Sequence, residues 1–253
     1  MRYALKNEYI VISLSTTPYR IDKIGPTLAT ILAQKAPIKT IYLNIPYVFK
    51  RDNTVYQIPE WLSNNNKIKI LRSDDYGPAT KLLGTLANAN LPAHAIIITL
   101  DDDVYYPDNL ILQLAYKAKL QPERAIGLIG ANLDPAAELG ITKIKKNDAI
   151  VSILQGYSGI AYRRYFFDNT VFEISKTPPE CINSDDIYLS YYLARHGIQR
   201  QVLHNAYISA CDVRWQTDIG TDNYSLHMLT PTPAEKHKNC MNFLTTQYSQ
   251  VAF

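Results

Sequence analysis

The chain has 253 residues, of which 47% are hydrophobic and 19% charged, as in an ordinary globular protein. Its formal net charge of +3 is too small to indicate a nucleic-acid-binding protein, which would carry a stronger basic stripe. No apolar run reaches the roughly 18 residues that span a bilayer, and the N-terminus lacks a signal-peptide apolar region. We therefore expect a cytoplasmic protein.

The three cysteines, Cys181, Cys211 and Cys240, are odd in number and far apart in the sequence. Disulfide frameworks usually show an even number of cysteines, and zinc sites show closely spaced pairs. We expect neither a disulfide framework nor a cysteine-based zinc site.

Hydrophobic periodicity divides the chain into strands and helices. Strands are expected at residues 8–15, 38–45, 67–71, 95–100, 125–129, 149–154 and 198–203, and helices at 24–34, 79–89, 109–120, 185–196 and, in short form, 234–244. Strands and helices alternate over the first 130 residues, which is typical of a mostly parallel sheet. The chain shows no repeat and no linker, so we expect one domain over residues 1–253.

Three adjacent carboxylates, Asp101, Asp102 and Asp103, directly follow the apolar run 95–100. They repel one another and lose solvation when buried, so a divalent cation would stabilise the ionised cluster. On an extended chain, Asp101 and Asp103 would point one way and Asp102 the other. Mg²⁺ and Mn²⁺ often combine one or two carboxylates with substrate phosphates, which makes this triplet a candidate metal site. A solvated acidic turn before a helix starting near Pro107 explains the triplet equally well.

Two other predicted strand ends carry polar groups suited to a nucleotide. Thr16 and Arg20 follow the first strand and offer a hydroxyl and a guanidinium fork. A helix-capping loop with a surface arginine is an equally good interpretation. Segment 74–81 follows the third strand, contains Asp75 and ends on Lys81 at a helix start, where backbone amides favour anions. The alternative is a tight turn with a solvated lysine, and here we favour the binding site.

Two later segments complete the pattern. Gly156, Ser158 and Gly159 follow a predicted strand, where glycines would let the backbone approach a ligand closely. An ordinary glycine turn is the alternative. Asp185 and Asp186 open a predicted helix, where carboxylates usually act as caps but can also serve as a fixed base for a hydroxyl. Taken alone, capping is the more common role.

Four stretches in this order, SLSTTPYRI, DYGPATKL, ITLDDDVYYP and NSDDIYLSYYL, resemble the GT-A-fold glycosyltransferases. The resemblance covers roughly residues 8–205 and is nearest to bacterial members of the family 2 type, which build envelope polysaccharides. It implies an α/β fold with a single GT-A domain, a Rossmann-like, mostly parallel sheet flanked by helices, and an irregular C-terminal acceptor-side portion. About residues 1–130 would bind the nucleotide sugar, and about residues 131–253 would bind the acceptor and form the C-terminal tail.

The resemblance also implies roles for the residues above. It implies a UDP-sugar donor, Mn²⁺ or Mg²⁺ as cofactor with Asp103 and Asp101 as ligands, and Asp186, with Asp185 as rival, as the catalytic base. A histidine ligand from the C-terminal segment is implied as well; His227 and His237 both qualify by position, and His227 is taken as the ligand. The donor would contact the remaining candidates, namely Thr16, Arg20, Asp75, Lys81, Asp101, Asp102, Gly156, Ser158 and Gly159.

These implications predict a metal-dependent transfer of a sugar from a UDP-sugar to a hydroxyl of a growing glycan, such as lipopolysaccharide or capsule, with inversion by single displacement. The acceptor would be a glycan or lipid-linked glycan, with Arg163, Arg164 and nearby tyrosines as its candidate face. Weak, salt-sensitive contact with the inner membrane would follow.

Two alternatives remain open. A sugar-phosphate nucleotidylyltransferase would also use an α/β sheet and a metal, but it normally carries a glycine-rich basic loop after the first strand, and residues 13–20 contain no glycine. A non-catalytic sugar-binding protein on the same fold would be expected to lose Asp103 or the Asp185/Asp186 pair, and all three are present.

Overall fold

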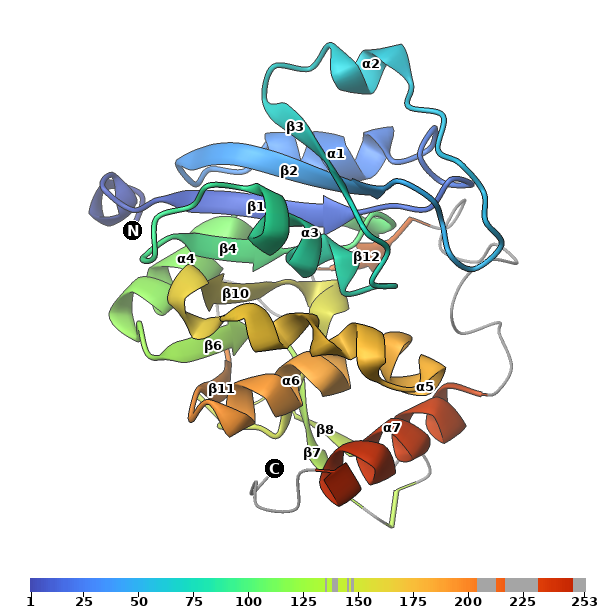
Figure 1. The fold of residues 1–253 in the computed structure, drawn as a ribbon. Helices are drawn as coiled ribbons and strands as arrows, with labels where there is room; N and C mark the ends of the chain where they lie inside the picture. The colour runs from blue at the N-terminus through green and yellow to red at the C-terminus, as the bar shows by residue number, and fades with distance from the viewer. Residues whose placement is uncertain are drawn as a thin grey trace.

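The computed structural model describes residues 1–134, 136–137, 141–144, 146, 148–203, 213–216 and 232–247. Its centre is a seven-stranded sheet in the order β11-β6-β10-β4-β1-β2-β3 (Figure 1). The strands are β1 (Ile10–Ser15), β2 (Ile38–Pro46), β3 (Ile68–Ser73), β4 (Ile96–Thr99), β6 (Arg124–Gly127), β10 (Ile160–Arg163) and β11 (Gln199–Val202). β10 runs antiparallel to both neighbours, β4 and β6, whereas the other pairings are parallel. The predicted α/β class with a mostly parallel sheet is confirmed.

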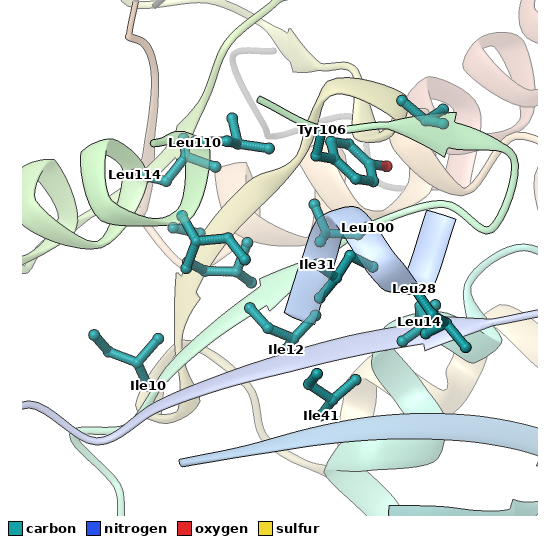
Figure 2. Packing of buried hydrophobic residues seen from close by; sticks show 14 of the residues in the cluster. Ile10, Ile12, Leu14, Leu28, Ile31, Ile41, Leu100, Tyr106, Leu110 and Leu114 are labelled. Atoms are coloured by element: carbon teal, nitrogen blue, oxygen red, sulfur yellow. The ribbon is translucent and has the colours of Figure 1, made fainter. Parts of the chain in front are cut away.

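Helices cover both faces of this sheet. α1 (Gly25–Leu32) and α4 (Leu110–Leu120) pack on one face, and α3 (Thr80–Asn88) and α6 (Asp185–Arg195) pack on the other. Side chains of β1 alternate between the two cores: Ile10, Ile12 and Leu14 lie on the α1 and α4 side (Figure 2), and Val11 lies on the opposite side. Because such strands are buried on both faces, they form the continuous apolar runs from which they were predicted.

Shorter elements surround the sheet. They are the helices α2 (Glu60–Ser63) and α5 (Pro179–Ile182) and the 3₁₀ helices η1 (Tyr3–Leu5), η2 (Gly156–Ser158), η3 (Arg164–Phe166) and η4 (Asn169–Lys176). The C-terminal helix α7 (Pro233–Gln247) is longer, with 15 residues. Two small sheets complete the described residues: β5 (Val104–Tyr105) pairs with β12 (Arg214–Trp215), and β7 (Gly130–Leu133) pairs with both β8 (Ile141–Ile144) and β9 (Ile153–Leu154).

The second half of the chain departs from the predicted elements. The strand expected at 149–154 is reduced to the two residues of β9, and Ile150 makes only an isolated bridge with Gln201. β10 was not predicted, because its sequence, Ile-Ala-Tyr-Arg, is neither a continuous apolar run nor an alternating one. No helix among the described residues is both long and apolar enough to cross a membrane.

Cys181 and Cys240 form a disulfide that joins α5 to α7, with their Cα atoms 4.7 Å apart. Both residues are fully buried, and Figure 1 shows α7 beside α5. The chain therefore contains a disulfide, although its cysteine pattern argued against a disulfide framework. The pairing could not be predicted because the two cysteines lie 59 residues apart and a third makes the count odd. Cys211 lies outside the described residues.

Candidate functional site

Two of the predicted segments meet at one edge of the central sheet. β1 and β4 are parallel neighbours, with Ser13 paired to Thr99. The residues that follow them, Thr16 and the triplet at 101–103, therefore leave the sheet side by side at its carboxyl edge. In open α/β sheets this edge is where ligands bind.

The three carboxylates of the triplet contact two different cations: Asp102 and Asp103 contact Arg20, and Asp101 contacts Lys81. Asp102 accepts a hydrogen bond from the Thr16 hydroxyl at 2.6 Å, and Arg20 Nη1 lies 3.3 Å from Asp102 Oδ1 and 3.0 Å from Asp103 Oδ2. Asp101 instead contacts Lys81. The expectation that Asp101 and Asp103 share one side is wrong, because β4 ends at Thr99 and the chain bends at Asp102 and Asp103.

In this part of the site, the positive charge of Arg20 does not fully balance the negative charge of the buried carboxylates. Arg20 is only 8% exposed, which rules out the interpretation of a surface arginine. Desolvation raises the pKa of Asp102, although Arg20 and Thr16 oppose the shift. Desolvation, followed by the charges of Asp102 and Asp101, raises the pKa of Asp103 to about 7, and Arg20 only partly offsets this. Both carboxylates would gain from a further cation beside them.

Lys81, on the first turn of α3, connects the triplet to the start of α6. Its Nζ lies 2.7 Å from Asp101 Oδ1 and 3.2 Å from Asp185 Oδ2, and the residue is buried. Burial lowers the pKa of Lys81, but the nearby carboxylates outweigh this and raise that pKa well above its usual value. The solvated-lysine interpretation is therefore wrong, and Lys81 is a charged bridge inside the site.

The two acidic residues that open α6 have different surroundings. Asp185 is buried against Lys81, whereas Asp186 is partly exposed and its Oδ1 accepts a hydrogen bond from the Gly156 amide at 2.9 Å. In the described structure, Ser184 occupies the N-cap position without a side-chain capping bond. Desolvation, followed by the charge of Asp185, raises the pKa of Asp186 to about 8, with Lys81 opposing the shift. A carboxylate with such a pKa accepts a proton readily near neutral pH.

The glycine segment contributes one residue to the site and two to the core. A Cβ on Gly156 would lie 2.8 Å from Asp186 Oδ1, so the missing side chain lets the carboxylate approach the backbone. Ser158 is fully buried, and its hydroxyl donates to the Gln155 carbonyl. Gly159 has φ +89° and lies against Leu100. The predicted ligand contacts of Ser158 and Gly159 are therefore wrong, because both face the protein interior.

Asp75 organises a loop. Its Oδ2 accepts from the Lys50 amide and its Oδ1 from the Gly77 amide, both at 2.8 Å. Gly77 has φ +63°, a left-handed conformation that favours glycine. The alternative interpretation of segment 74–81 as a tight turn is therefore correct for Asp75 and Gly77. Lys81, at the end of the segment, belongs instead to the ion pairs with Asp101 and Asp185.

Sequence reasoning missed two tyrosines that hold the site together. The Tyr106 hydroxyl accepts from the Asp101 amide at 2.8 Å and lies 3.2 Å from the Tyr157 carbonyl, so it ties the triplet to the glycine segment. The Tyr56 hydroxyl donates to the Thr16 carbonyl at 2.9 Å. Tyr106 could have been suspected from its position just after the triplet, but nothing in the local sequence distinguishes Tyr56.

The predicted metal ligands are only partly brought together. Asp101 and Asp103 face different cations, and His227 lies outside the described residues. His237 lies on α7, where burial lowers its pKa and the charge of Asp185 opposes that shift. Within the described ranges, no three His, Cys, Asp or Glu side chains form a metal-binding group. The residues offer carboxylate oxygens, which suit Mg²⁺ or Mn²⁺, and Asp103 is the carboxylate whose charge is least balanced by neighbouring cations. They do not form a complete set of metal ligands.

The two arginines predicted for the acceptor face lie at the other edge of the sheet. Arg163 pairs with Ile96, at the amino end of β4, and contacts Glu8 Oε2 at 3.2 Å and the His94 carbonyl at 2.6 Å. It is 6% exposed. Arg164 follows it directly. The predicted acceptor face therefore lies away from the charged cluster, and its contact with an acceptor remains a prediction.

Comparison with known proteins does not establish a family for this chain. No protein-family model matches the chain, and no curated protein is significantly similar in sequence. A 2-C-methyl-D-erythritol 4-phosphate cytidylyltransferase from Francisella tularensis is similar in structure, with a TM-score of 0.46 and 13% identity over 79% of this chain and 90% of that one. That protein is a nucleotidylyltransferase, the class of the alternative function. A likeness of this degree does not decide the activity, and membership of glycosyltransferase family 2 is not confirmed.

Proposed function

We propose that the chain is a glycosyltransferase that moves a sugar from a UDP-sugar to a hydroxyl of a glycan acceptor. The observation that carries this proposal is the buried Lys81 ammonium, which contacts Asp101 of the triplet and Asp185 at the start of α6. Lys81 thereby connects the carboxylate triplet, which is suited to bind a nucleoside diphosphate through a metal, with the acidic start of α6, which is suited to deprotonate a hydroxyl. Both groups would then act on opposite sides of one sugar.

The donor side would consist of the triplet with Thr16 and Arg20. Asp103 is the residue that would hold Mn²⁺ or Mg²⁺, because its pKa of about 7 marks a carboxylate that lacks compensating charge. Water and the substrate's phosphates would complete the shell. When bound, such a cation stabilises the negative charge that develops on the leaving diphosphate. Arg20 positions Asp103 and Asp102 by pairing with both.

The acceptor side would depend on Asp186. Its Oδ1 is fixed by the Gly156 amide, and its pKa of about 8 suits removal of a hydroxyl proton as the acceptor oxygen attacks the anomeric carbon. Asp185, held by Lys81, keeps that pKa high. A single base on this side is sufficient for a single displacement, which gives inversion.

Asp186 also separates this proposal from the nucleotidylyltransferase alternative. In that reaction the attacking group is a sugar phosphate, whose oxygen is already ionised near neutral pH and needs no base. A sugar hydroxyl is protonated at that pH and does need one. A carboxyl with a raised pKa, held by a backbone amide, therefore favours glycosyl transfer.

A two-armed assay tests the proposal. In the first arm, the protein is incubated with Mn²⁺, a panel of UDP-sugars and mixed oligosaccharide acceptors, and UDP release and product mass are measured. In the second, it is given nucleoside triphosphates with sugar 1-phosphates, and pyrophosphate release is measured. We expect UDP and an elongated glycan in the first arm only. Pyrophosphate release with no UDP-dependent product would establish the alternative instead.

The acceptor is proposed to be a growing, lipid-linked glycan at the inner membrane. The mild positive charge of the chain would give only weak attachment to anionic lipid. Recovery in the membrane fraction should therefore fall as salt is raised. Equal transfer to free and lipid-linked sugars, with no membrane fraction at low salt, would contradict this part of the proposal.

A further inference from the structure

A groove lies between α3 and η4, outside the charged site. Its volume is about 330 Å³, at the lower end of the roughly 300–1,000 Å³ of small-molecule sites. Its lining includes Tyr76, Leu86 and Ala87 on or before α3, and Arg164, Asn169 and Phe172 from the segment that follows β10.

The groove runs from the site edge of the sheet toward the opposite edge. Tyr76 lies between Asp75 and Gly77, in the loop that leads to Lys81. Arg164 follows Arg163, which pairs with the first residue of β4, Ile96. An extended ligand in this groove would therefore lie along α3, with one end near the candidate site.

The lining combines aromatic faces with a polar rim. The Tyr76 and Phe172 rings are partly exposed and lie with centroids 5.6 Å apart. Arg164 uses Nη1 to donate to the Phe167 carbonyl at 2.7 Å, which fixes a guanidinium that carries several donors. Asp168, which also lines the groove, accepts from the Thr170 amide at 2.8 Å and from the Tyr192 hydroxyl at 3.1 Å.

The charges in this lining balance one another. Hydrogen bonds from Thr170 lower the pKa of Asp168 to about 2, so it is ionised at neutral pH and offsets Arg164. A phosphate or nucleotide would meet no surplus of positive charge here. A neutral sugar suits the groove better, because it presents a face of C–H groups to an aromatic ring and a rim of hydroxyls to donors and acceptors.

We propose that the groove between α3 and η4 is a second carbohydrate subsite, which binds a neutral sugar unit of the acceptor glycan remote from the reacting hydroxyl. This proposal rests on the proposed function for its biological meaning, but binding in the groove does not require catalysis. Because the contact forms equally in the bound and reacting states, it lowers KM for longer acceptors and leaves kcat nearly unchanged.

The test fills the groove from an exposed position. Ala87 is exposed on α3, so Ala87→Trp places a large ring over the groove without disturbing the core, and Ala87→Ser is the matched control. Asn169→Ala is a second variant, which removes a polar group from the rim. The probe is a printed panel of neutral hexose and N-acetylhexosamine oligosaccharides of two to four units. Calorimetry on the best binder follows, with UDP binding measured in parallel.

We expect the wild type and Ala87→Ser to bind the same oligosaccharide. Ala87→Trp should weaken that binding roughly tenfold and Asn169→Ala roughly threefold, with UDP affinity unchanged. No binding by the wild type to any panel member, or equal affinity in Ala87→Trp, would overturn the subsite. Loss of binding in Ala87→Trp without any UDP-sugar turnover by the wild type would keep the subsite and reject the proposed function.

Discussion

Gly156→Ala tests whether the position of the Asp186 carboxylate matters to the reaction. The added Cβ would lie 2.8 Å from Asp186 Oδ1 and 3.1 Å from Lys81 Nζ, whereas ordinary contacts of this kind begin near 3.4 Å. The carboxylate must therefore move by about half an ångström or more, and its hydrogen bond to the backbone amide is lost or lengthened. A misplacement of this size in a reacting group lowers turnover by roughly 10- to 100-fold.

The assay is UDP release at saturating donor and acceptor, together with calorimetric UDP affinity and the thermal midpoint. Gly25→Ala is the matched control, because a Cβ there would meet nothing within 4 Å. We expect kcat to fall only in the Gly156 variant, with UDP affinity within about threefold in both. A kcat within twofold of the wild type, with the fold intact, would refute the role assigned to the contact between Gly156 and Asp186.

Three further substitutions examine the other parts of the site. Asp103→Ala should remove the part of UDP affinity that depends on Mn²⁺, measured by calorimetry with and without EDTA; an unchanged metal dependence would exclude Asp103 as the ligand. Lys81→Met leaves the buried Asp185 and the partly buried Asp101 without their cation. It should lower the free energy of unfolding by about 3 kcal/mol or more in urea titrations, and a loss below 1 kcal/mol would count against the bridge. Cys181→Ser opens a loop of 59 residues and should lower the free energy of unfolding by about 4 kcal/mol, as should reduction of the wild type; equal stability of oxidised and reduced protein would show that the bond does not hold α7.

The first half of the fold could be predicted because its strands are buried on both faces. Runs such as residues 95–100 are apolar throughout, and the structure places β4 at Ile96–Thr99 in the middle of the sheet. β10 lies beside β4 inside the sheet and is equally short, but its sequence contains a tyrosine and ends on an arginine, so it does not form a continuous apolar run. Its position in the sheet depends on pairing with β4 and β6, which are distant in the sequence, so the local sequence does not predict it.

The candidate site, too, could be predicted from the sequence only in part. Local sequence indicated the triplet, Lys81 and Asp186, because carboxylates and a lysine at element ends are unusual enough to notice. It could not indicate which of them pair, since Lys81 and Asp185 are brought together only by the packing of α3 and α6 on the same face of the sheet. For the same reason, Ser158 and Gly159 looked available in sequence but face the core, and Tyr106 and Tyr56 were missed.

The central claim is that the carboxylate of Asp186 removes the proton from an acceptor hydroxyl. Its most direct test is the pH dependence of sugar transfer by the wild type, Asp186→Asn and Asp185→Asn. A base works only when deprotonated, so the wild-type rate should rise with pH and level off above the Asp186 pKa of about 8. Asp186→Asn should lose that rising limb and about 10²-fold or more in kcat, while Asp185→Asn should lose less and shift the limb to lower pH. An unchanged limb and rate in Asp186→Asn would contradict the account.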